Sequence, residues 1–213
     1  NTLSHERECL DKLPPYLKKK VRLEMCQPLL SICFFEKLPK KYVAGIIQSG
    51  KKHIIPARET IFEHGDIGNH MYFLVNGSVE FLCLDKSQQY CVYESGMFFG
   101  EESMEEQFFE GGGGRHTHRS FHAVAWTPCV LYSFSAKDMW EHAVWFDSQN
   151  ITQINVCDYV RGVATERQEI MKNYIRTREK VWDLQREQHK RSARVIPPHP
   201  AADGRVGFRL DES

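Results

Sequence analysis

The most restrictive feature of this sequence is a series of short apolar runs between residues 51 and 134, interrupted every few positions by turn-forming residues. β-Branched and aromatic side chains fill these runs with a period of two, as in Met71–Val75 and Ser78–Leu84. Gly65-Asp66, Asn76-Gly77 and Ser95-Gly96 separate the runs, and such pairs favour tight turns between antiparallel strands. About eight short strands at this spacing predict a barrel or a two-sheet, jelly-roll-like β-roll.

Helical patterns flank this region on both sides. Pro14-Pro15 marks the start of an N-terminal helix, and Pro28 is expected to end or kink it. After the last strand, Ser135 and Asp138 have the spacing of a helix N-cap. A second, charged helix is expected from Ile151 onward. The predicted fold class is therefore α+β, an antiparallel eight-stranded β-roll flanked by N-terminal and C-terminal helices.

The stretch Ser95–Met104, together with Arg119, has the composition of a phosphate-binding cassette. Gly96 and Gly100 allow sharp turns that expose backbone N–H groups, and an acidic segment then favours one helical turn. Arg119 returns after a glycine-rich loop, and a guanidinium pairs a phosphate bidentately. The sequence therefore predicts a site for one small anion.

Charge and motifs exclude several classes of function. The chain has 28 basic and 28 acidic side chains, so its net charge of zero argues against nucleic-acid binding, which needs a positive field. Seven cysteines occur without a C-x-x-C pair, and we interpret them as reduced core thiols. No Walker, zinc-protease or nucleophile-elbow motif is present. We predict no catalysis, no metal, and no cofactor.

No apolar run reaches the roughly 20 residues that span a bilayer. We therefore expect no direct membrane insertion of this chain. Because the sequence begins with Asn1, we also expect that it is a piece of a longer parent protein.

The order of these parts, over roughly residues 36–165, resembles the cyclic-nucleotide-binding domain family. The stretch Phe62–Val79 resembles the family's strand-turn-strand signature, and Phe99–Met104 resembles its cassette. Arg119-Ser120 and the run Cys129–Ser135 resemble the end of the cassette and the strand that leads into the first C-terminal helix.

Residues 1–35 resemble part of the C-linker of hyperpolarization-activated and cyclic-nucleotide-gated cation channels. The resemblance implies the cytoplasmic domain of an integral membrane protein, whose partners are a pore domain and further subunits of a homotetramer. The predicted parts are a partial C-linker (1–35), the cyclic-nucleotide-binding domain (36–165), an extended charged helix (166–194) and a disordered tail (195–213).

The resemblance also implies roles for individual residues toward cAMP or cGMP. Arg119 would pair with the cyclic phosphate, and backbone N–H groups near Gly100, Glu102 and Ser103 would share it. Glu101 would accept a hydrogen bond from the ribose 2′-hydroxyl. Ser120 stands where the purine contact is expected, and the apolar wall and the closing helix would use Phe81, Cys91, Tyr93, Val160 and Arg161.

Three features depart from the family pattern. Phe121 replaces a small residue, Glu102 brings a second carboxylate that opposes an anion unless it faces solvent, and the loop 105–118 is long. Arg115 is an alternative to Arg119 if the register differs. Two alternatives to a channel sensor remain open, namely a nucleotide-free docking and assembly module and a soluble cyclic-nucleotide receptor.

Overall fold

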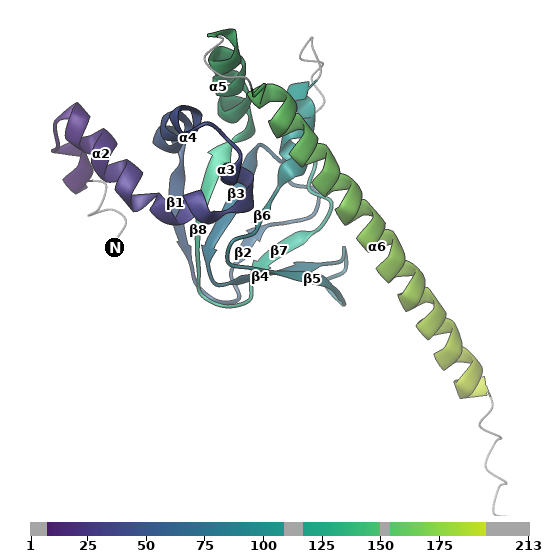
Figure 1. The fold of residues 1–213 in the computed structure, drawn as a ribbon. Helices are drawn as coiled ribbons and strands as arrows, with labels where there is room; N and C mark the ends of the chain where they lie inside the picture. The colour runs from purple at the N-terminus through teal and green to yellow at the C-terminus, as the bar shows by residue number, and fades with distance from the viewer. Residues whose placement is uncertain (1–7, 109–116, 150–153, 195–213) are drawn as a thin grey trace, which may run out of the picture. The chain divides into compact units, whose positions relative to one another are not determined.

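The computed structural model describes residues 8–108, 117–149 and 154–194. Two four-stranded antiparallel sheets form a β-roll, with strand orders β1-β8-β3-β6 and β2-β7-β4-β5 (Figure 1). The strands are β1 (Lys51–Ile55), β2 (Thr60–Phe62), β3 (His70–Asn76), β4 (Ser78–Leu82), β5 (Gln89–Glu94), β6 (Phe98–Phe99), β7 (His122–Ala125) and β8 (Cys129–Ser135). This arrangement confirms the predicted α+β fold with its eight-stranded antiparallel roll.

Helices precede and follow the roll, and one lies within it. They are α2 (Pro15–Met25), η1 (Gln27–Ser31), α3 (Cys33–Glu36), α4 (Lys40–Ile46), η2 (Ile47–Ser49), η3 (Glu101–Phe108), α5 (Ala136–Ser148) and α6 (Val156–Arg194). Helix α2 begins at Pro15 as predicted, since proline fits the first helical turn. The Ser135 hydroxyl accepts a hydrogen bond from the Asp138 N–H at 3.3 Å, which confirms the predicted N-cap of α5.

The turns of the roll use glycine where the backbone requires it. Gly77 and Gly96 have φ angles of +94° and +92°, a region that side-chain-bearing residues rarely adopt. Gly77 joins β3 to β4, and Gly96 precedes β6. The tight turns predicted from Asn76-Gly77 and Ser95-Gly96 are therefore present.

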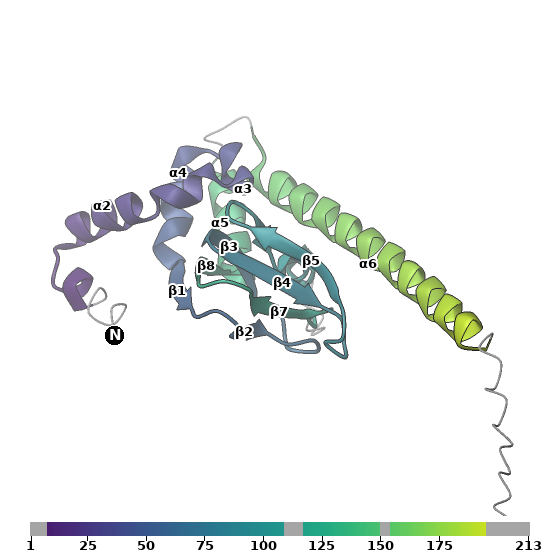
Figure 2. The ribbon, with the colours of Figure 1, turned by 90° about the horizontal axis from the view of Figure 1, so that it is seen from below.

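The N-terminal helices and the roll share one hydrophobic core. The rings of Phe34 and Phe35 in α3 lie 5.2 and 4.7 Å, centroid to centroid, from Phe73 of β3. Both phenylalanines are buried. Helices α4 and α5 lie side by side (Figures 1 and 2), and the Tyr42 hydroxyl donates to the Met139 carbonyl at 3.1 Å. The helices before the roll thus complete its core.

The chain divides into two compact units, residues 1–174 and residues 175–213. The second unit contains the last part of α6, which is a continuous helix to Arg194. The predicted boundaries after residues 35 and 165 remain predictions. The predicted tail at 195–213 lies outside the described residues.

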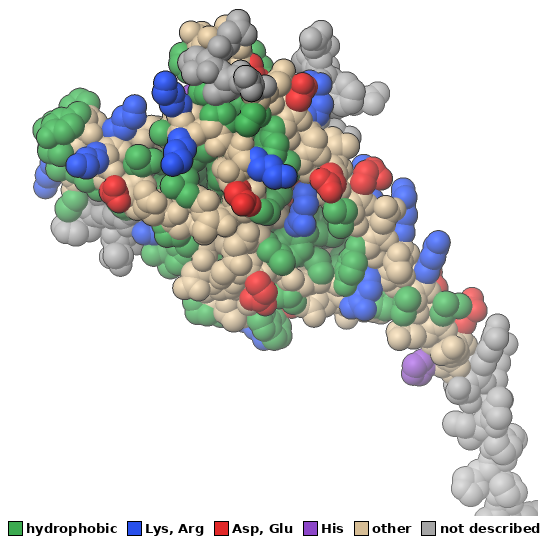
Figure 3. All heavy atoms as spheres, viewed as in Figure 1, with side chains coloured by type: hydrophobic (Ala, Val, Ile, Leu, Met, Phe, Trp, Pro, Cys, Tyr) green, Lys and Arg blue, Asp and Glu red, His purple; other side chains and the backbone are tan. Residues whose placement is uncertain are grey.

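Side chains of both charge signs are interspersed over the face drawn in Figure 3. Of the cysteines, Cys26, Cys83 and Cys129 are buried, whereas Cys9 and Cys33 are exposed. The expectation that all seven are core thiols is therefore wrong for Cys9 and Cys33, which lie on the exposed sides of N-terminal helices. Within the described residues, every helix is too short or too polar to cross a bilayer.

Candidate anion-binding site

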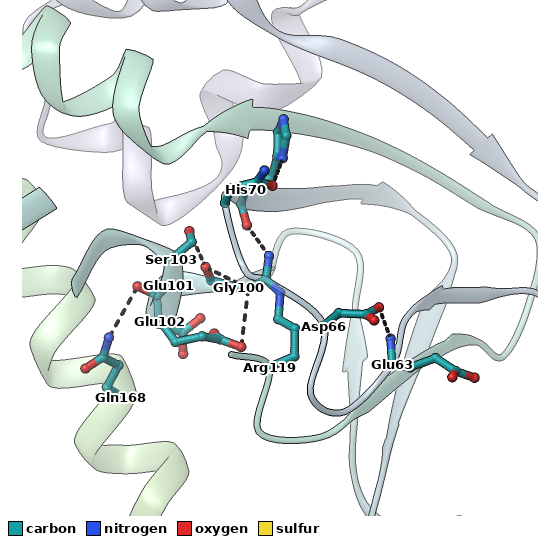
Figure 4. A network of polar contacts seen from close by, with 10 residues as sticks. Glu63, Asp66, His70, Gly100, Glu101, Glu102, Ser103, Arg119 and Gln168 are labelled. Carbon is teal, nitrogen blue, oxygen red and sulfur yellow. Dashed lines mark hydrogen bonds and ion pairs between the residues drawn. The ribbon is translucent and has the colours of Figure 1, made fainter. Parts of the chain in front are cut away.

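The centre of the candidate site is Arg119, which lies just before β7 and is only 2% exposed. Its Nη2 donates to the His70 carbonyl at 2.6 Å, and its Nη1 donates to the Gly100 carbonyl at 3.2 Å (Figure 4). The backbone of Arg119 is held as well, because its N–H donates to the Asp66 carbonyl at 2.8 Å. The guanidinium is therefore fixed between the first residue of β3 and the start of the cassette.

Two glycines and two aromatic rings shape the space around this guanidinium. A Cβ on Gly100, whose φ is +84°, would lie 2.8 Å from the His70 carbonyl oxygen and 3.0 Å from Nη1 of Arg119. A Cβ on Gly68 would lie 3.1 Å from the guanidinium carbon. The same carbon lies 4.5 Å from the ring centroid of Phe62 and 5.7 Å from that of Tyr72. Gly100 is thus required both by its backbone angle and by the closeness of Arg119.

The charge partner of Arg119 is the carboxylate of Glu102. Glu102 Oε1 lies 3.3 Å from Arg119 Nη1, and the two side chains are 12% and 2% exposed. Within the described residues, this buried oxygen has no aligned hydrogen-bond donor, so the contact is an ion pair without a hydrogen bond. The Glu102 carboxylate therefore does not face solvent but turns inward to the arginine.

Glu101 is the second carboxyl group of the cassette, and it is 3% exposed. Burial raises its pKa to about 7, and the neighbouring Glu102 carboxylate adds to this effect. The Glu101 carbonyl accepts a hydrogen bond from Nε2 of Gln168 on α6 at 3.3 Å. A carboxyl with this pKa exchanges its proton near neutral pH, so its charge is sensitive to any group that enters the site.

The carbonyl of Gly100 holds the cassette together. It accepts from the Ser103 N–H at 3.1 Å, from the Ser103 hydroxyl at 2.7 Å and from Arg119. A carbonyl oxygen has two lone pairs, so these three donors share it. The first turn of η3 and the arginine are consequently tied to one backbone atom, and this confirms the helical turn predicted after Gly100.

Aromatic side chains fill the interior of the roll beside Arg119. Phe81 of β4 is fully buried, and its ring lies 4.7 Å from that of Tyr93 and 4.9 Å from that of Phe121. Strand register pairs Phe81 with Cys91, which places Cys91 and Tyr93 on the same face as Phe81. Phe121 points inward and is 4% exposed, whereas the preceding Ser120 is exposed. Phe81, Cys91 and Tyr93 thus lie on one face of the sheet and Phe121 packs against Phe81, while their role toward a base stays a prediction.

Helix α6 contacts the cassette about two turns further along its length than the predicted Val160 and Arg161. Val160 is buried in the core cluster, and the Arg161 guanidinium lies over the Trp140 ring, 5.3 Å from its centroid. The guanidinium of Arg167 instead lies 5.3 Å from the Tyr93 centroid and 5.1 Å from the Phe98 centroid. The structure therefore brings Arg167 and Gln168 to the cassette, whereas Arg161 lies against Trp140 of α5, and Val160 packs in the core cluster that also contains Met104.

The sequence contained a usable signal for these two residues. Arg167 and Gln168 follow Val160 and Arg161 by seven positions, which is about two helical turns, so each lies on nearly the same helix face as its counterpart. His70, Phe62 and Tyr72 were missed entirely. The contact of His70 uses a backbone carbonyl, which any residue provides.

The described part of the chain holds no group of side chains suited to bind a metal ion, since no three or more metal-ligating side chains come together there. His118 Nδ1 lies 2.8 Å from the Gly65 carbonyl. Arg115, which the sequence offered as an alternative to Arg119, lies outside the described residues.

Comparison with known proteins finds a likeness over part of the chain. Residues 52–143 match the family model described as "Cyclic nucleotide-binding domain". No curated protein matches the chain by sequence.

Two solved structures resemble the fold. One is described as "Sp-2Cl-cAMPS bound to PKAR CBD2"; it is 14% identical with a TM-score of 0.57, and the match covers 77% of this chain and 94% of that one. A putative cyclic nucleotide-binding protein from Geobacter metallireducens GS-15 is 18% identical with a TM-score of 0.49, over 66% and 95% of the two chains. At such identities the likeness to the first structure shows the fold alone.

Proposed function

Because residues 52–143 match the family model of the cyclic nucleotide-binding domain, we propose that this region binds cAMP or cGMP and that Arg119 anchors the cyclic phosphate. The observation that carries the proposal is the fixed, buried guanidinium of Arg119 beside Gly100. A planar guanidinium in a site sheltered from water pairs strongly with a phosphate. No catalytic step is required for this role.

The other residues of the cassette would recognise the sugar and share the anion. Glu101 is an acceptor for the ribose 2′-hydroxyl once it has lost its proton, and a bound hydroxyl donor favours that ionised form. Backbone N–H groups at Gly100 and Glu102 would face the phosphate at the first turn of η3, whereas the Ser103 N–H donates to the Gly100 carbonyl and would have to exchange that bond to share the anion. Phe81, Cys91 and Tyr93 would supply apolar surface to the base.

We further propose that the domain regulates a cation channel through its N-terminal helices. Contacts among these helices, with the roll and with α6 support this coupling. Arg22 of α2 donates to the Gln48 carbonyl at 2.8 Å, and the Tyr132 hydroxyl of β8 donates to the Met25 carbonyl at 3.2 Å. On α6, the Tyr159 hydroxyl donates to the Phe34 carbonyl at 3.1 Å. A shift of α6 would thus reach α3 directly. In this proposal the chain is the cytoplasmic domain of a tetrameric membrane protein, and the N-terminal helices pass the shift to its pore domain.

Calorimetric titration of the 213-residue chain with cAMP and with cGMP tests the binding step. Arg119→Ala is expected to weaken binding by about 2 to 5 kcal/mol, the range for truncating one partner of a buried charge pair. Arg119→Lys keeps the charge but loses the planar fork, so its affinity is expected to lie between those of Arg119→Ala and the unchanged chain. Arg176→Ala, at an exposed position of α6, is the matched control. Equal affinity of Arg119→Ala and the unchanged chain would exclude this site.

A second candidate function is a nucleotide-free docking module. The observation in its favour is that Arg119 already has two carbonyl acceptors and a carboxylate partner. If neither nucleotide produces saturable heat at millimolar concentration, the docking function is favoured. Saturable heat that disappears in Arg119→Ala favours the sensor.

A further inference from the structure

We propose that Glu102 is a built-in counter-ion of Arg119, whose carboxylate occupies the anion position until a cyclic phosphate displaces it. This inference rests on the proposed function. It makes ligand binding an exchange of one anion for another at a single guanidinium, and it assigns to Glu102 the control of how much ligand is needed.

Burial of the charge is the first argument. A guanidinium that is 2% exposed has lost its hydration, and a buried cation without an anion is costly. The carbonyls of His70 and Gly100 accept its protons but bring no net charge. Glu102 is the acidic side chain that is in ion-pair contact with Arg119, at 3.3 Å. The carboxylate therefore supplies the neutralising charge that a phosphate would otherwise supply.

Orientation of the guanidinium is the second argument, because it does not depend on Glu102. Two carbonyl hydrogen bonds, two close glycines and the Phe62 ring already fix the plane of the group. The carboxylate also makes no aligned hydrogen bond to Arg119, as a group that set its direction would. The contribution of Glu102 is thus mainly charge, and charge is what an incoming phosphate replaces.

The position of Glu102 gives the exchange a structural consequence. Glu102 lies in the first turn of η3, next to Glu101, whose carbonyl accepts from Gln168 of α6. The Glu102 carboxylate lies 3.3 Å from Arg119, so it would repel a phosphate bound to the same arginine, and the Glu102 side chain must move away when the ligand enters. Figure 4 shows that the Glu102–Arg119 ion pair and the hydrogen bond from Gln168 to the Glu101 carbonyl belong to adjacent residues of one turn, so a move of Glu102 is expected to be felt at α6.

The observed affinity then reflects the difference between two ion pairs. A ligand shifts an equilibrium only by its advantage over what it replaces. Removal of the internal competitor should strengthen binding of every cyclic nucleotide, since the competition concerns the phosphate and not the base.

Glu102→Gln is the direct test, because the amide keeps the shape and removes the charge. Titration of the full chain with cAMP is expected to show at least about tenfold tighter binding than the unchanged protein, a factor equal to about 1.4 kcal/mol. Glu141→Gln is the matched control, since Glu141 is exposed on α5 and pairs only with Lys137 at 3.7 Å in the described structure. This control is expected to leave the affinity unchanged.

Further measurements separate failure of this inference from failure of the proposed function. Equal or weaker binding by Glu102→Gln, with the unchanged protein still binding, overturns the counter-ion role alone. If neither protein binds cAMP, the proposed function fails. The counter-ion role is then decided by thermal melting in inorganic phosphate, which should stabilise Glu102→Gln more than the unchanged chain, and equal stabilisation overturns it.

A second variant guards against loss of folding. Glu102→Asp keeps the charge but withdraws the carboxylate by one methylene, so it is expected to fold and to bind with intermediate affinity. Arg119→Ala should weaken binding more in the Glu102→Gln background than in the unchanged chain, because without Glu102 the charge of Arg119 interacts with the ligand alone. An equal cost in both backgrounds contradicts the exchange.

Discussion

At the scale of single residues, Glu101 is a carboxyl group whose proton links stability to pH. Its pKa in the folded protein is about 7, above the ordinary value of 4.5, because burial disfavours the charged form. The folded state holds the proton more tightly than the unfolded state does. The stabilisation from this proton is complete below about pH 4.5 and is lost as the pH rises through 7.

Glu101→Gln should therefore gain stability relative to the unchanged protein as the pH rises. We expect the difference in free energy of unfolding to change by roughly 3 kcal/mol between pH 4.5 and 8, the energy of the displaced pKa. Urea unfolding of both proteins across this pH range measures it. Other titrating groups cancel in the comparison, so a difference that does not vary with pH would show that Glu101 ionises normally.

The residue scale also shows which side chains follow from local rules. Gly96 and Gly100 were predicted as turn positions, and their φ angles of +92° and +84° bear this out. Glu102 does not follow from local rules. Its carboxylate turns inward because it pairs with Arg119, which lies seventeen positions later in the chain, and no sequence pattern near Glu102 predicts this contact.

At the scale of elements, the contact between α6 and the roll depends on Arg167. Its guanidinium lies over the rings of Tyr93 and Phe98, and Gln168 adds the hydrogen bond to Glu101. Arg167→Ala should lower the free energy of unfolding by about 1 kcal/mol, the scale of a partly buried cation–π contact. Amide hydrogen exchange should also rise along Val156–Tyr174 and in η3, because the helix loses its hold on the cassette.

Arg176→Ala is the control for this element, because Arg176 is exposed on the same helix and its removal tests helix propensity alone. If both variants change exchange equally, the rings do not hold α6. A third protein, Arg167→Lys, keeps the charge and should recover only part of the protection, since a guanidinium stacks on aromatic rings better than an ammonium does.

At the scale of the whole molecule, the N-terminal helices are part of the folding unit. Phe34 and Phe35 precede the predicted domain start at residue 36, yet they pack against Phe73 and Phe134 inside the roll. A fragment of residues 36–174 should lose cooperative unfolding, because removal of one buried phenylalanine alone costs about 3 to 5 kcal/mol. Thermal unfolding followed by circular dichroism measures this loss.

The fragment 8–174 is the matched control, and it should unfold at nearly the temperature of the full chain. The basis is the division of the chain after Tyr174, which leaves the roll and its helices in one unit. Equal cooperativity of the fragments 36–174 and 8–174 would show that the roll folds without its N-terminal helices and would support the boundary predicted from sequence.

The sequence by itself determined the roll, its turns, the cap of α5 and the location of the cassette. These features rest on local patterns, namely alternation along strands, glycine at positive φ and a serine before a helix, so nearby residues are sufficient. Only the tertiary structure decided that Arg167 rather than Arg161 meets the roll, that Phe121 enters the aromatic interior, and that Glu102 pairs with Arg119. Each of these depends on how segments far apart in the chain are packed, and burial then fixes which charges must be paired.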